Sequence, residues 1–387
     1  MVSLFYLYLC IYMLKIQMMK NNPYKICHLT TAHLYNDTRI FLKQCTSLSK
    51  FYSVFLINTN SPIDLKIDNG INLININYTA KNRLQRFLIS TYKVYKAAKK
   101  LNADIYHFHD PELIPYALLL RIKGKKVIYD IHEDLPRQLL TKNYIPKITR
   151  NLLSAIIEYC ENFCSKFFSY LITATETIEN RFKKENKHTK TINNYPIINE
   201  LCSIPIKEKN NKKFCYVGSI TKERGFKEML KIAKETDIKL NIGGKFYPET
   251  LINETISYKD NVVYLGFLNR NDIFKLYSNS IAGLVLLHPT KNYIVSKPVK
   301  MFEYMAAGLP IIASDFNLFK DIIEKNKCGF CVDPFDIKQV STYIKKLMDN
   351  PKLAIEMGQN GRKVVLKKYN WAIEEKKLLS IYQNLLN

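Results

Sequence analysis

Two lysines near a predicted helix start give the segment Ser296–Pro310 the chemistry of an anion site. Pro298 fits the first turn of a helix, and Gly308, followed closely by another proline, fits its end. The free N–H groups and the dipole at such a helix start favour a diphosphate, and Lys297 and Lys300 add positive charge beside it. We therefore expect this helix to bind a phosphorylated ligand.

Glu303 lies further along the same predicted helix. A carboxylate at this point can accept two hydrogen bonds from the diol of a ribose, as acidic residues do in dinucleotide sites. A solvated glutamate on the helix surface is the alternative, and Glu303 taken alone fits that alternative better.

Other polar and glycine residues follow directly after short apolar runs that we interpret as strands. They are His109, Asp110, His132 and Glu133 in the first half, and Gly218, Gly243, Gly244, Gly266, His288 and Pro289 in the second. In open parallel sheets, ligands bind outside the carboxyl ends of the strands. These positions predict a ligand cleft lined from both halves of the chain.

Short apolar runs alternate with amphipathic runs along nearly the whole chain, which predicts an α/β fold with parallel sheets and crossover helices. The strands expected in the first half are Tyr24–Leu29, Tyr52–Ile57, Asn72–Ile76, Asp104–Phe108, Lys126–Asp130 and Tyr170–Thr173. Those expected in the second half are Phe214–Val217, Lys239–Ile242, Val262–Leu265, Gly283–Leu287, Pro310–Ala313 and Gly329–Val332. Helices are expected at Arg39–Ser49, Arg83–Leu101 and Glu112–Ile122, and along Asp336–Leu386.

A length of 387 residues with 47% hydrophobic residues suits two domains, each with its own core. The expected divisions are a hydrophobic N-terminal extension (1–20), an N-terminal domain (21–205), a linker (206–212), a C-terminal domain (213–369) and a C-terminal helix (370–387) that packs back toward the N-terminal domain. The apolar part of the extension is shorter than the roughly 20 residues of a membrane helix. We interpret it as an over-extended translation start, with a weak membrane anchor as the alternative.

The chain is strongly basic, with 58 Lys and Arg against 34 Asp and Glu and a formal net charge of +24. Such a charge attracts nucleic acid, anionic lipid or phosphorylated small molecules, although a lysine-rich coding bias explains the excess equally well. The nine cysteines are scattered and odd in number, which favours a reducing compartment over a disulfide framework. Cys328 and Cys331 have C-x-x-C spacing without a second pair, so we expect core packing there rather than a metal site.

Four motifs together resemble those of the family 4 (group 1) glycosyltransferases, which are retaining enzymes with the GT-B fold. Pro298–Asp315 resembles the donor-binding signature of the family, and Asp104–Leu113, Val127–Asp134 and Tyr216–Gly225 resemble three further motifs. The resemblance runs from about Lys25 to Tyr382 and implies two Rossmann-like domains whose parallel sheets face a central cleft. The commonest relatives of this kind act in bacterial surface-polysaccharide assembly.

The resemblance implies roles for individual residues. The donor-binding residues are Gly218, Ser219, Arg224, Gly266, Phe267, Lys297, Lys300 and Glu303, and the catalytic residues are His132 and Glu303. Two positions depart from the family pattern: Val295 replaces an acidic residue that contacts the transferred sugar, and Ser219 replaces a phosphate-binding arginine. These departures leave a non-catalytic nucleotide-sugar-binding subunit as an alternative. A salt-bridged surface position is the alternative for Arg224, and a satisfied core histidine the alternative for His132.

On the acceptor side, the residues implied are His33, Asp37, Arg39, His109, Asp110 and Glu133. Asp37 precedes the helix expected from Arg39, and capping of that helix is the slightly favoured interpretation. Asp110 precedes Pro111, so it fits a helix cap as well as it fits a site.

The activity implied is transfer of a sugar from a UDP- or GDP-linked donor to a glycan or lipid-linked acceptor, with retention and without a metal or other cofactor. The acceptor hydroxyl would attack on the leaving-group face while the departing diphosphate accepts its proton, and the protein would position the reactants and stabilise charge. A nucleotide-sugar epimerase of the same fold is an alternative. Charge alone suggests nucleic acid, and no recognition motif accompanies it, so we expect no nucleic-acid partner.

We expect a cytoplasmic protein with peripheral contact to the inner face of the plasma membrane. The candidate face is Tyr78–Lys100, which contains Arg83, Arg86, Lys93, Lys96, Lys99 and Lys100. Basic side chains near an anionic bilayer contribute about 1 kcal/mol each. A solvated helix face is the alternative.

Overall fold

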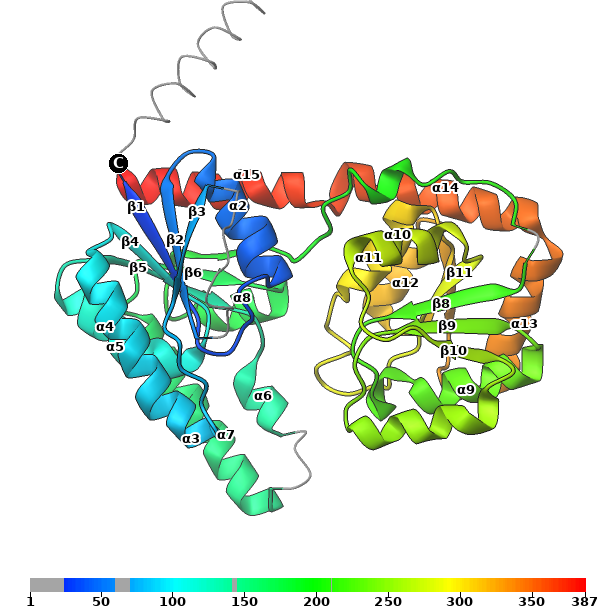
Figure 1. Ribbon diagram of the computed structural model, residues 1–387, viewed down its shortest axis with the longest axis horizontal. Coiled ribbons are helices and arrows are strands. Elements are labelled where there is room, and N and C mark those ends of the chain that lie inside the picture. Colours follow the sequence, from blue (N-terminus) through cyan, green and yellow to red (C-terminus); the bar gives the residue numbers. More distant parts are fainter. Residues whose placement is uncertain (1–23, 60–69, 141–144, 210) are drawn as a thin grey trace, which may run out of the picture. The chain divides into compact units, whose positions relative to one another are not determined.

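The computed structural model describes residues 24–59, 70–140, 145–209 and 211–387 (Figure 1). It divides into two units: unit 1 is Met1–Asn194 with Glu374–Asn387, and unit 2 is Tyr195–Ile373. The expected N-terminal extension, residues 1–20, lies outside the described residues.

Unit 1 contains a parallel sheet of seven strands in the order β3-β2-β1-β4-β5-β6-β7. The strands are β1 (Lys25–Leu29), β2 (Ser53–Asn58), β3 (Ile71–Asn75), β4 (Ile105–Phe108), β5 (Lys126–Ile131), β6 (Tyr170–Thr173) and β7 (Thr189–Thr191). The short strand β7 was not expected from the sequence, since only three residues pair and two of them are threonines. The helical segments are η1 (Thr38–Cys45), α2 (Thr46–Ser49), α3 (Arg83–Gln85), η2 (Arg86–Ser90), α4 (Thr91–Leu101), η3 (Pro111–Leu113), α5 (Ile114–Ile122), α6 (Leu135–Leu139), α7 (Lys147–Ser165) and α8 (Glu176–Phe182).

Unit 2 contains a parallel sheet of six strands in the order β10-β9-β8-β11-β12-β13. The strands are β8 (Lys213–Val217), β9 (Lys239–Gly243), β10 (Val262–Tyr264), β11 (Ala282–Val285), β12 (Ile311–Ser314) and β13 (Gly329–Val332). The helical segments are η4 (Leu201–Ser203), η5 (Lys222–Arg224), α9 (Phe226–Thr236), η6 (Glu249–Tyr258), α10 (Arg270–Ser278), α11 (Val299–Ala307), α12 (Asn317–Ile323), α13 (Ile337–Asp349) and α14 (Pro351–Lys368). The last helix, α15 (Trp371–Leu386), begins in unit 2 and continues into unit 1.

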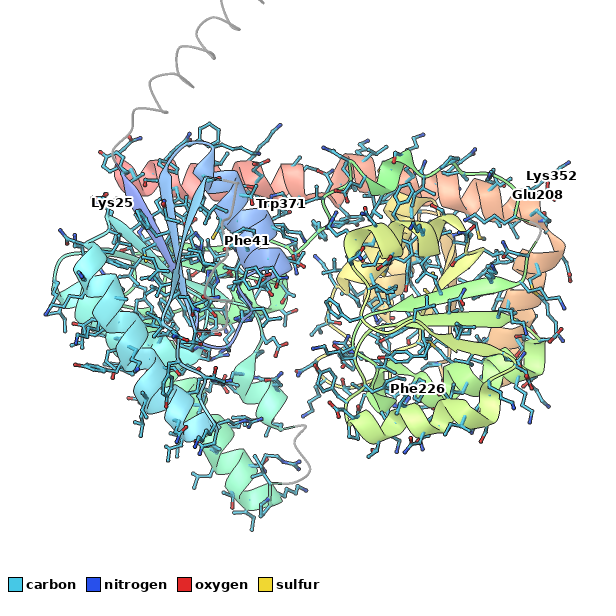
Figure 2. The ribbon with its side chains drawn as sticks, viewed as in Figure 1. Lys25, Phe41, Glu208, Phe226, Lys352 and Trp371 are labelled. Atoms are coloured by element: carbon cyan, nitrogen blue, oxygen red, sulfur yellow. The ribbon has the colours of Figure 1, made fainter. Side chains whose placement is uncertain are left out.

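Each sheet carries apolar side chains on both faces, as parallel strands covered by helices require. Phe41 on η1 and Phe226 on α9, both labelled in Figure 2, are buried core residues of their units. The α/β architecture with two parallel sheets predicted from the sequence is therefore confirmed. No helix in the described ranges is both long enough and apolar enough to cross a bilayer.

The boundary between the units lies earlier than the linker expected at 206–212. The units divide between Asn194 and Tyr195 because the residues that follow pack into the core of unit 2. Leu201 and Ile204 belong to a hydrophobic cluster there, and the carbonyl of Ile204 accepts a hydrogen bond from Arg362 at 2.7 Å. The described residues of 206–212 belong to unit 2, and Lys207, Glu208 and Lys212 among them are exposed.

Candidate functional site

Side-chain alternation along three neighbouring strands of unit 1 gathers histidines on one face of the sheet. Residues two apart in a strand point to the same face. On β1 and β4 this face carries His28 and His107, which are register partners, and His109 continues it just after β4. On β5 the same face carries Asp130, and His132 follows one step beyond the strand. The opposite face, with Tyr106, Phe108 and Tyr129 among other residues, belongs to the apolar core.

Asp130 is the buried centre of this cluster. Its carboxylate makes a two-point ion pair with Arg39, with Nη2 at 2.6 Å from Oδ1 and Nε at 3.0 Å from Oδ2. Gln44 also donates to Oδ2, at 2.8 Å. Burial acts to raise the pKa of Asp130, but the charges of Arg39 and His132 and the hydrogen bonds from the histidines hold that pKa well below its usual value. Asp130 is therefore an ionised carboxylate that only accepts hydrogen bonds.

Two imidazoles meet at the same oxygen of Asp130. Nδ1 of His109 lies 3.2 Å from Oδ2, and Nε2 of His132 lies 3.1 Å from it. An ionised carboxylate cannot donate, so each nitrogen makes this bond only when it carries the proton. The two nitrogens also lie 3.2 Å from each other. When His132 is neutral, its other nitrogen, Nδ1, is then left with a lone pair that can accept a hydrogen bond.

The proton assignment extends to the buried end of the cluster. Burial lowers the pKa of His109 to about 3, so its ring is neutral and its Nε2 is an acceptor. His28 donates to that nitrogen through Nδ1, at 3.0 Å. His107 contacts the hydroxyl of Tyr382, on α15, at 2.6 Å. Burial lowers the pKa of His28 and of His107 as well, so the inner part of the cluster is uncharged.

Two groups of side chains in the described ranges bring three donor atoms close enough to hold a metal ion. They are His28 with His107 and His109, and His109 with Asp130 and His132. The guanidinium of Arg39 already neutralises the only carboxylate in either group, and a cation beside it would be repelled. In the first group, Nε2 of His28 and Nε2 of His107 are buried and have no hydrogen-bond partner within the described ranges.

His33 and Asp110 form a second polar pair in unit 1. Nδ1 of His33 lies 3.0 Å from Oδ1 of Asp110, and the other carboxylate oxygen accepts from Thr30 Oγ1 at 2.7 Å and from the Thr31 N–H at 2.6 Å. Burial acts to raise the pKa of Asp110, but these donors and His33 hold it below its usual value. Burial acts to lower the pKa of His33, but Asp110 raises it overall. The pair is an ionic contact that holds the loop after β1.

The other sequence-predicted acceptor-side residues differ in what their side chains contact. Asp37 is the N-cap of η1, accepting from the N–H groups of Arg39 and Ile40 at 2.8 and 2.9 Å. Asp110 makes no capping bond to η3, so that interpretation was wrong; the loop after β1 takes its oxygens instead. Glu133 is exposed and accepts from Gln138.

Arg39 corrects the prediction that it lines the acceptor side. Its side chain is only 4% exposed, and its guanidinium is used by Asp130 and by the backbone carbonyl of Ile192, at 2.7 Å from Nη1. The sequence pattern could not show this because Asp130 follows far along the chain. Arg39 therefore stabilises the carboxylate at the centre of the histidine cluster and is not available for a ligand in this structure.

In unit 2, the loop after β8 has a backbone that only glycine allows. Gly218 has φ +130°, and the carbonyl of Gly218 approaches Gly244 so closely that a Cβ on Gly244 would lie 1.9 Å from it. Gly244 itself has φ +139°. The loop therefore lies flat against its neighbour and exposes backbone beside Lys300 and Arg224.

Lys300 is the most unusual side chain near this loop. Its Nζ lies 3.6 Å from the centre of the Tyr216 ring and would be 3.0 Å from a Cβ placed on Gly218. Within the described ranges, Nζ is buried and has no hydrogen-bond acceptor. Burial, followed by the charge of Arg224, holds the pKa of Lys300 well below its usual value, while the charge of Glu303 acts the other way.

Arg224 approaches the same loop from η5. One of its terminal nitrogens would lie 3.7 Å from a Cβ on Gly218, and its Nε donates to the hydroxyl of Tyr293 at 3.2 Å. No carboxylate in the described part of the chain forms a salt bridge with Arg224, so the surface-salt-bridge interpretation does not describe it. Ser219, in contrast, uses its backbone carbonyl to accept from Tyr216 at 2.7 Å.

Glu303 projects from α11, whose N-cap is Pro298. The side chain is half-buried, and Oε2 accepts a hydrogen bond from the hydroxyl of Tyr277 at 3.2 Å. The hydroxyl of Tyr277 thus fixes one carboxylate oxygen of Glu303. The interpretation of Glu303 as a freely solvated surface glutamate does not fit this contact.

The remaining predicted donor residues differ in their surroundings. Lys297 donates to the hydroxyl of Tyr195 at 3.4 Å. Gly266 has φ +71°, and the next residue, Phe267, is 74% exposed with Lys245 over its ring. Val295, at the position of the expected acidic residue, is 37% exposed.

Several residues of these clusters were not predicted from the sequence. They are His28, His107, Asp130, Tyr216, Tyr277 and Tyr293. A signal existed for two of them, His107 and Asp130. His107 and His109 are two residues apart, as are Asp130 and His132, and a period of two places each pair on one face of a strand. Tyr277 and Tyr293 could not be found in this way, because they reach Glu303 and Arg224 from other elements of unit 2.

Comparison with known proteins places the chain in a family. Residues 45–194 match the family model described as glycosyltransferase family 4, and residues 200–364 match the model described as glycosyl transferases group 1. The chain belongs to this family, the group 1 (family 4) glycosyltransferases with the GT-B fold.

Individual relatives agree with that assignment. The capsular polysaccharide biosynthesis glycosyltransferase CapM of Staphylococcus aureus is 27% identical over 44% of this chain and 46% of CapM, so the chain matches about half the length of this and the next curated relatives. An uncharacterized glycosyltransferase of Haemophilus influenzae is 23% identical over 80% of this chain and 85% of that protein. The crystal structure of HepE from Anabaena in complex with UDP has a TM-score of 0.68 and 14% identity, covering 93% of this chain and all of HepE.

Proposed function

We propose that the chain is a retaining, metal-independent glycosyltransferase of surface-polysaccharide synthesis. In this proposal it moves a sugar from a nucleoside-diphosphate sugar to a glycan or lipid-linked acceptor. The observation that carries the proposal is the buried amine of Lys300, which points at the Gly218 loop without an acceptor in the described ranges. A buried charge without a counter-charge is costly, and a diphosphate would supply the missing acceptors.

The surroundings of Lys300 suit a diphosphate rather than a smaller anion. Arg224 adds a planar guanidinium beside the same loop, and α11 begins one residue before Lys300 with N–H groups that no capping side chain occupies. Glu303, further along α11 and held by Tyr277, is placed to accept hydrogen bonds from a ribose. The family membership and the UDP complex of HepE support the same ligand class.

His132 of unit 1 is the proposed contact to the transferred sugar. Its Nε2 lies 3.1 Å from Oδ2 of Asp130, so Nδ1 is the nitrogen that we propose contacts a sugar hydroxyl. The ring is partly exposed, 17%, whereas the histidines behind it are buried. The departing diphosphate is the proposed base for the acceptor hydroxyl, and Lys300 and Arg224 stabilise the charge that develops on it.

The test uses the purified full chain. Its thermal stability is measured with UDP, GDP, dTDP and CMP, and we expect one of them to raise it; a ligand at 100 times its Kd adds about 2.7 kcal/mol. With the matching sugar donor and an acceptor, turnover should persist in a chelator, and donor and product should share their anomeric configuration. Inversion of the anomeric centre, or loss of turnover in the chelator, would contradict the respective part of the proposal.

A second candidate is a nucleotide-sugar-binding subunit without turnover. Val295 in place of an acidic residue and Ser219 in place of an arginine support it. A subunit without turnover would be stabilised by the nucleotide but would form no glycosylated product. An epimerase of the same fold would instead convert the donor sugar without an acceptor.

Peripheral contact with the inner face of the plasma membrane completes the proposal. The exposed lysines of α4 are Lys96, Lys99 and Lys100, and the stretch Tyr78–Lys100 contains no acidic residue. Arg86, predicted as part of this face, instead forms a salt bridge with Glu112 at 2.6 Å.

A further inference from the structure

Helix α7 of unit 1 has its polar side turned inward and its apolar side turned out. The exposed apolar residues are Ile148, Leu152, Ile156, Tyr159 and Phe163, with exposures between 50% and 86%. Their spacing of four, four, three and four residues places them on one stripe along the helix. A surface helix of a globular protein normally shows the opposite arrangement.

The inward side of α7 explains why the helix is stable in this orientation. Glu161 is buried and accepts from the hydroxyl of Tyr129 at 2.8 Å, and it forms an ion pair with Arg181 at 2.6 Å. Ser154 donates to the carbonyl of Pro136 at 2.9 Å. These polar contacts fix the rotation of α7, so the outward apolar stripe is a property of the fold and not of a loose helix.

We propose that α7 inserts its apolar stripe into the interface of a bilayer that contains anionic lipids. This inference deepens the peripheral membrane contact proposed above and rests on it; it adds the element that enters the lipid. An interfacial helix buries its apolar face at the boundary between head groups and acyl chains. Tyr159 and Phe163 give the stripe aromatic rings, which favour that boundary.

The charges around α7 favour lipid over a second copy of the chain. Both acidic residues of the helix, Glu158 and Glu161, are paired with arginines on the inward side. The exposed charge next to the stripe is therefore basic, beginning with Lys147. A two-fold contact through this face would bring like charges together, whereas anionic head groups complement them.

The helices next to α7 in unit 1 also carry exposed apolar and basic residues. Helix α5 packs against both α4 and α7, and Figure 1 shows these elements within unit 1. Ile122, at the end of α5, is 81% exposed beside the exposed Lys123. On η2 and α4, Leu88 and Tyr92 are exposed near the lysines of the predicted basic face. Apolar and basic groups are thus combined on all three helices.

The proposal predicts a component of membrane binding that salt does not remove. Charge attraction is screened at about 1 M salt, where the Debye length is near 3 Å, but burial of apolar groups is not. We expect the full chain to float with phosphatidylcholine–phosphatidylglycerol vesicles at about 0.1 M salt and to remain partly bound at about 1 M.

The decisive variant removes two residues of the stripe, Leu152→Ser with Tyr159→Ser. It should lower the vesicle partition coefficient about tenfold or more at high salt. The matched control is Ile252→Ser with Ile256→Ser, which alters exposed isoleucines of unit 2 and should bind as the wild type does. Both variants should keep the nucleotide-induced thermal shift. A failure of the membrane proposal can therefore be told apart from a failure of the proposed transferase.

A second measurement reports insertion directly. Trp371, the single tryptophan, is buried, so a tryptophan introduced by Ile148→Trp should be the one quenched by brominated lipid. Wild-type binding by the stripe variant, or absence of quenching in vesicle-bound Ile148→Trp, would overturn the proposal. Sedimentation showing a dimer that the stripe variant disrupts, with vesicle binding unchanged, would assign the stripe to a second copy instead.

Discussion

The side-chain nitrogen of Lys300 lies 3.6 Å from the centre of the Tyr216 ring, its closest favourable contact in the described part of the chain. A cation over an aromatic face gains about 1–2 kcal/mol, less than the cost of removing an ammonium group from water. The folded chain therefore holds Lys300 in an unfavourable position that an anionic ligand would relieve.

Replacing Lys300 tests this relation. Lys300→Met should leave the chain as stable as the wild type or more stable at neutral pH, because it removes a buried amine that has no acceptor in the described ranges, yet it should abolish stabilisation by a nucleoside diphosphate. Thermal melts with and without UDP or GDP measure both effects. Lys291→Met, at an exposed lysine of the same unit, is the control and should change neither. If Lys300→Met melts well below the wild type but is still stabilised by nucleotide, Lys300 supports the fold and does not bind the ligand.

The lowered pKa of Lys300 also predicts proton uptake on binding. Between the lowered value and the ordinary value near 10.4, the unfolded chain holds a proton that the folded chain lacks, so this residue's contribution to stability rises with pH across that window. A bound diphosphate favours the charged amine and raises its pKa again. Calorimetry in two buffers of different protonation enthalpy, at mildly alkaline pH, should show uptake in the wild type. Lys300→Met should take up fewer protons when the nucleotide binds.

Glu303 should matter for the ribose and not for folding. Glu303→Gln keeps the shape but weakens charged hydrogen bonds, which contribute about 1.5–3 kcal/mol and correspond to roughly a 10- to 100-fold loss of nucleotide affinity. Binding of UDP or GDP by calorimetry measures the change. Glu235→Gln, at an exposed glutamate of α9, should bind normally. Equal affinity in Glu303→Gln and the wild type would remove Glu303 from the site.

The sequence was sufficient for the two parallel sheets because each buried strand is a short apolar run between turn residues. It located the Gly218 loop and α11 for a similar reason: glycines with positive φ and a proline before a helix are local signals. It could not assign Arg39, since the partner that buries it, Asp130, comes from another strand. Nor could it predict the aromatic partner of each lysine, which is Tyr195 for Lys297 and Tyr216 for Lys300.

The apolar stripe on α7 shows a further limit of pattern reading. Periodicity predicts an apolar face but assigns it to the core by default. Here Tyr129 and Arg181 fix the polar side inward, and neither is near α7 in sequence. The basic stretch Tyr78–Lys100 was visible from composition alone, whereas the outward orientation of the apolar stripe needed the structure.

The pair of His33 and Asp110 predicts a pH-dependent part of the stability of unit 1. Asp110 has a lowered pKa, so its contribution is present above about pH 4 and lost as pH falls through the folded value. His33 has a raised pKa, so its contribution is present below about pH 6.5 and lost as pH rises through the folded value. The pair therefore stabilises most between these limits.

Two variants separate the partners of this pair. Asp110→Asn should lower the free energy of unfolding by about 1–3 kcal/mol near pH 5 and by less as pH rises, and NMR should show a lower pKa for His33. His33→Gln should remove only the part that is lost at higher pH, because Thr30 and Thr31 still donate to Asp110. An unchanged His33 titration in Asp110→Asn would show that the ion pair does not form in solution.

Arg39 offers the sharpest contrast between the sequence prediction and the structure. If Arg39 contacts the acceptor, Arg39→Met should raise the KM for the acceptor and leave the free energy of unfolding unchanged. As the buried partner of Asp130, the same change should cost about 3–5 kcal/mol of unfolding free energy in urea titrations, since it leaves a carboxylate buried without its counter-charge. Adding Asp130→Asn should cost less than the sum of the two single changes, because the neutral amide no longer needs that counter-charge. A stable Arg39→Met protein with a raised acceptor KM would return Arg39 to the acceptor side and would mean that Gln44 and the histidines suffice to hold Asp130.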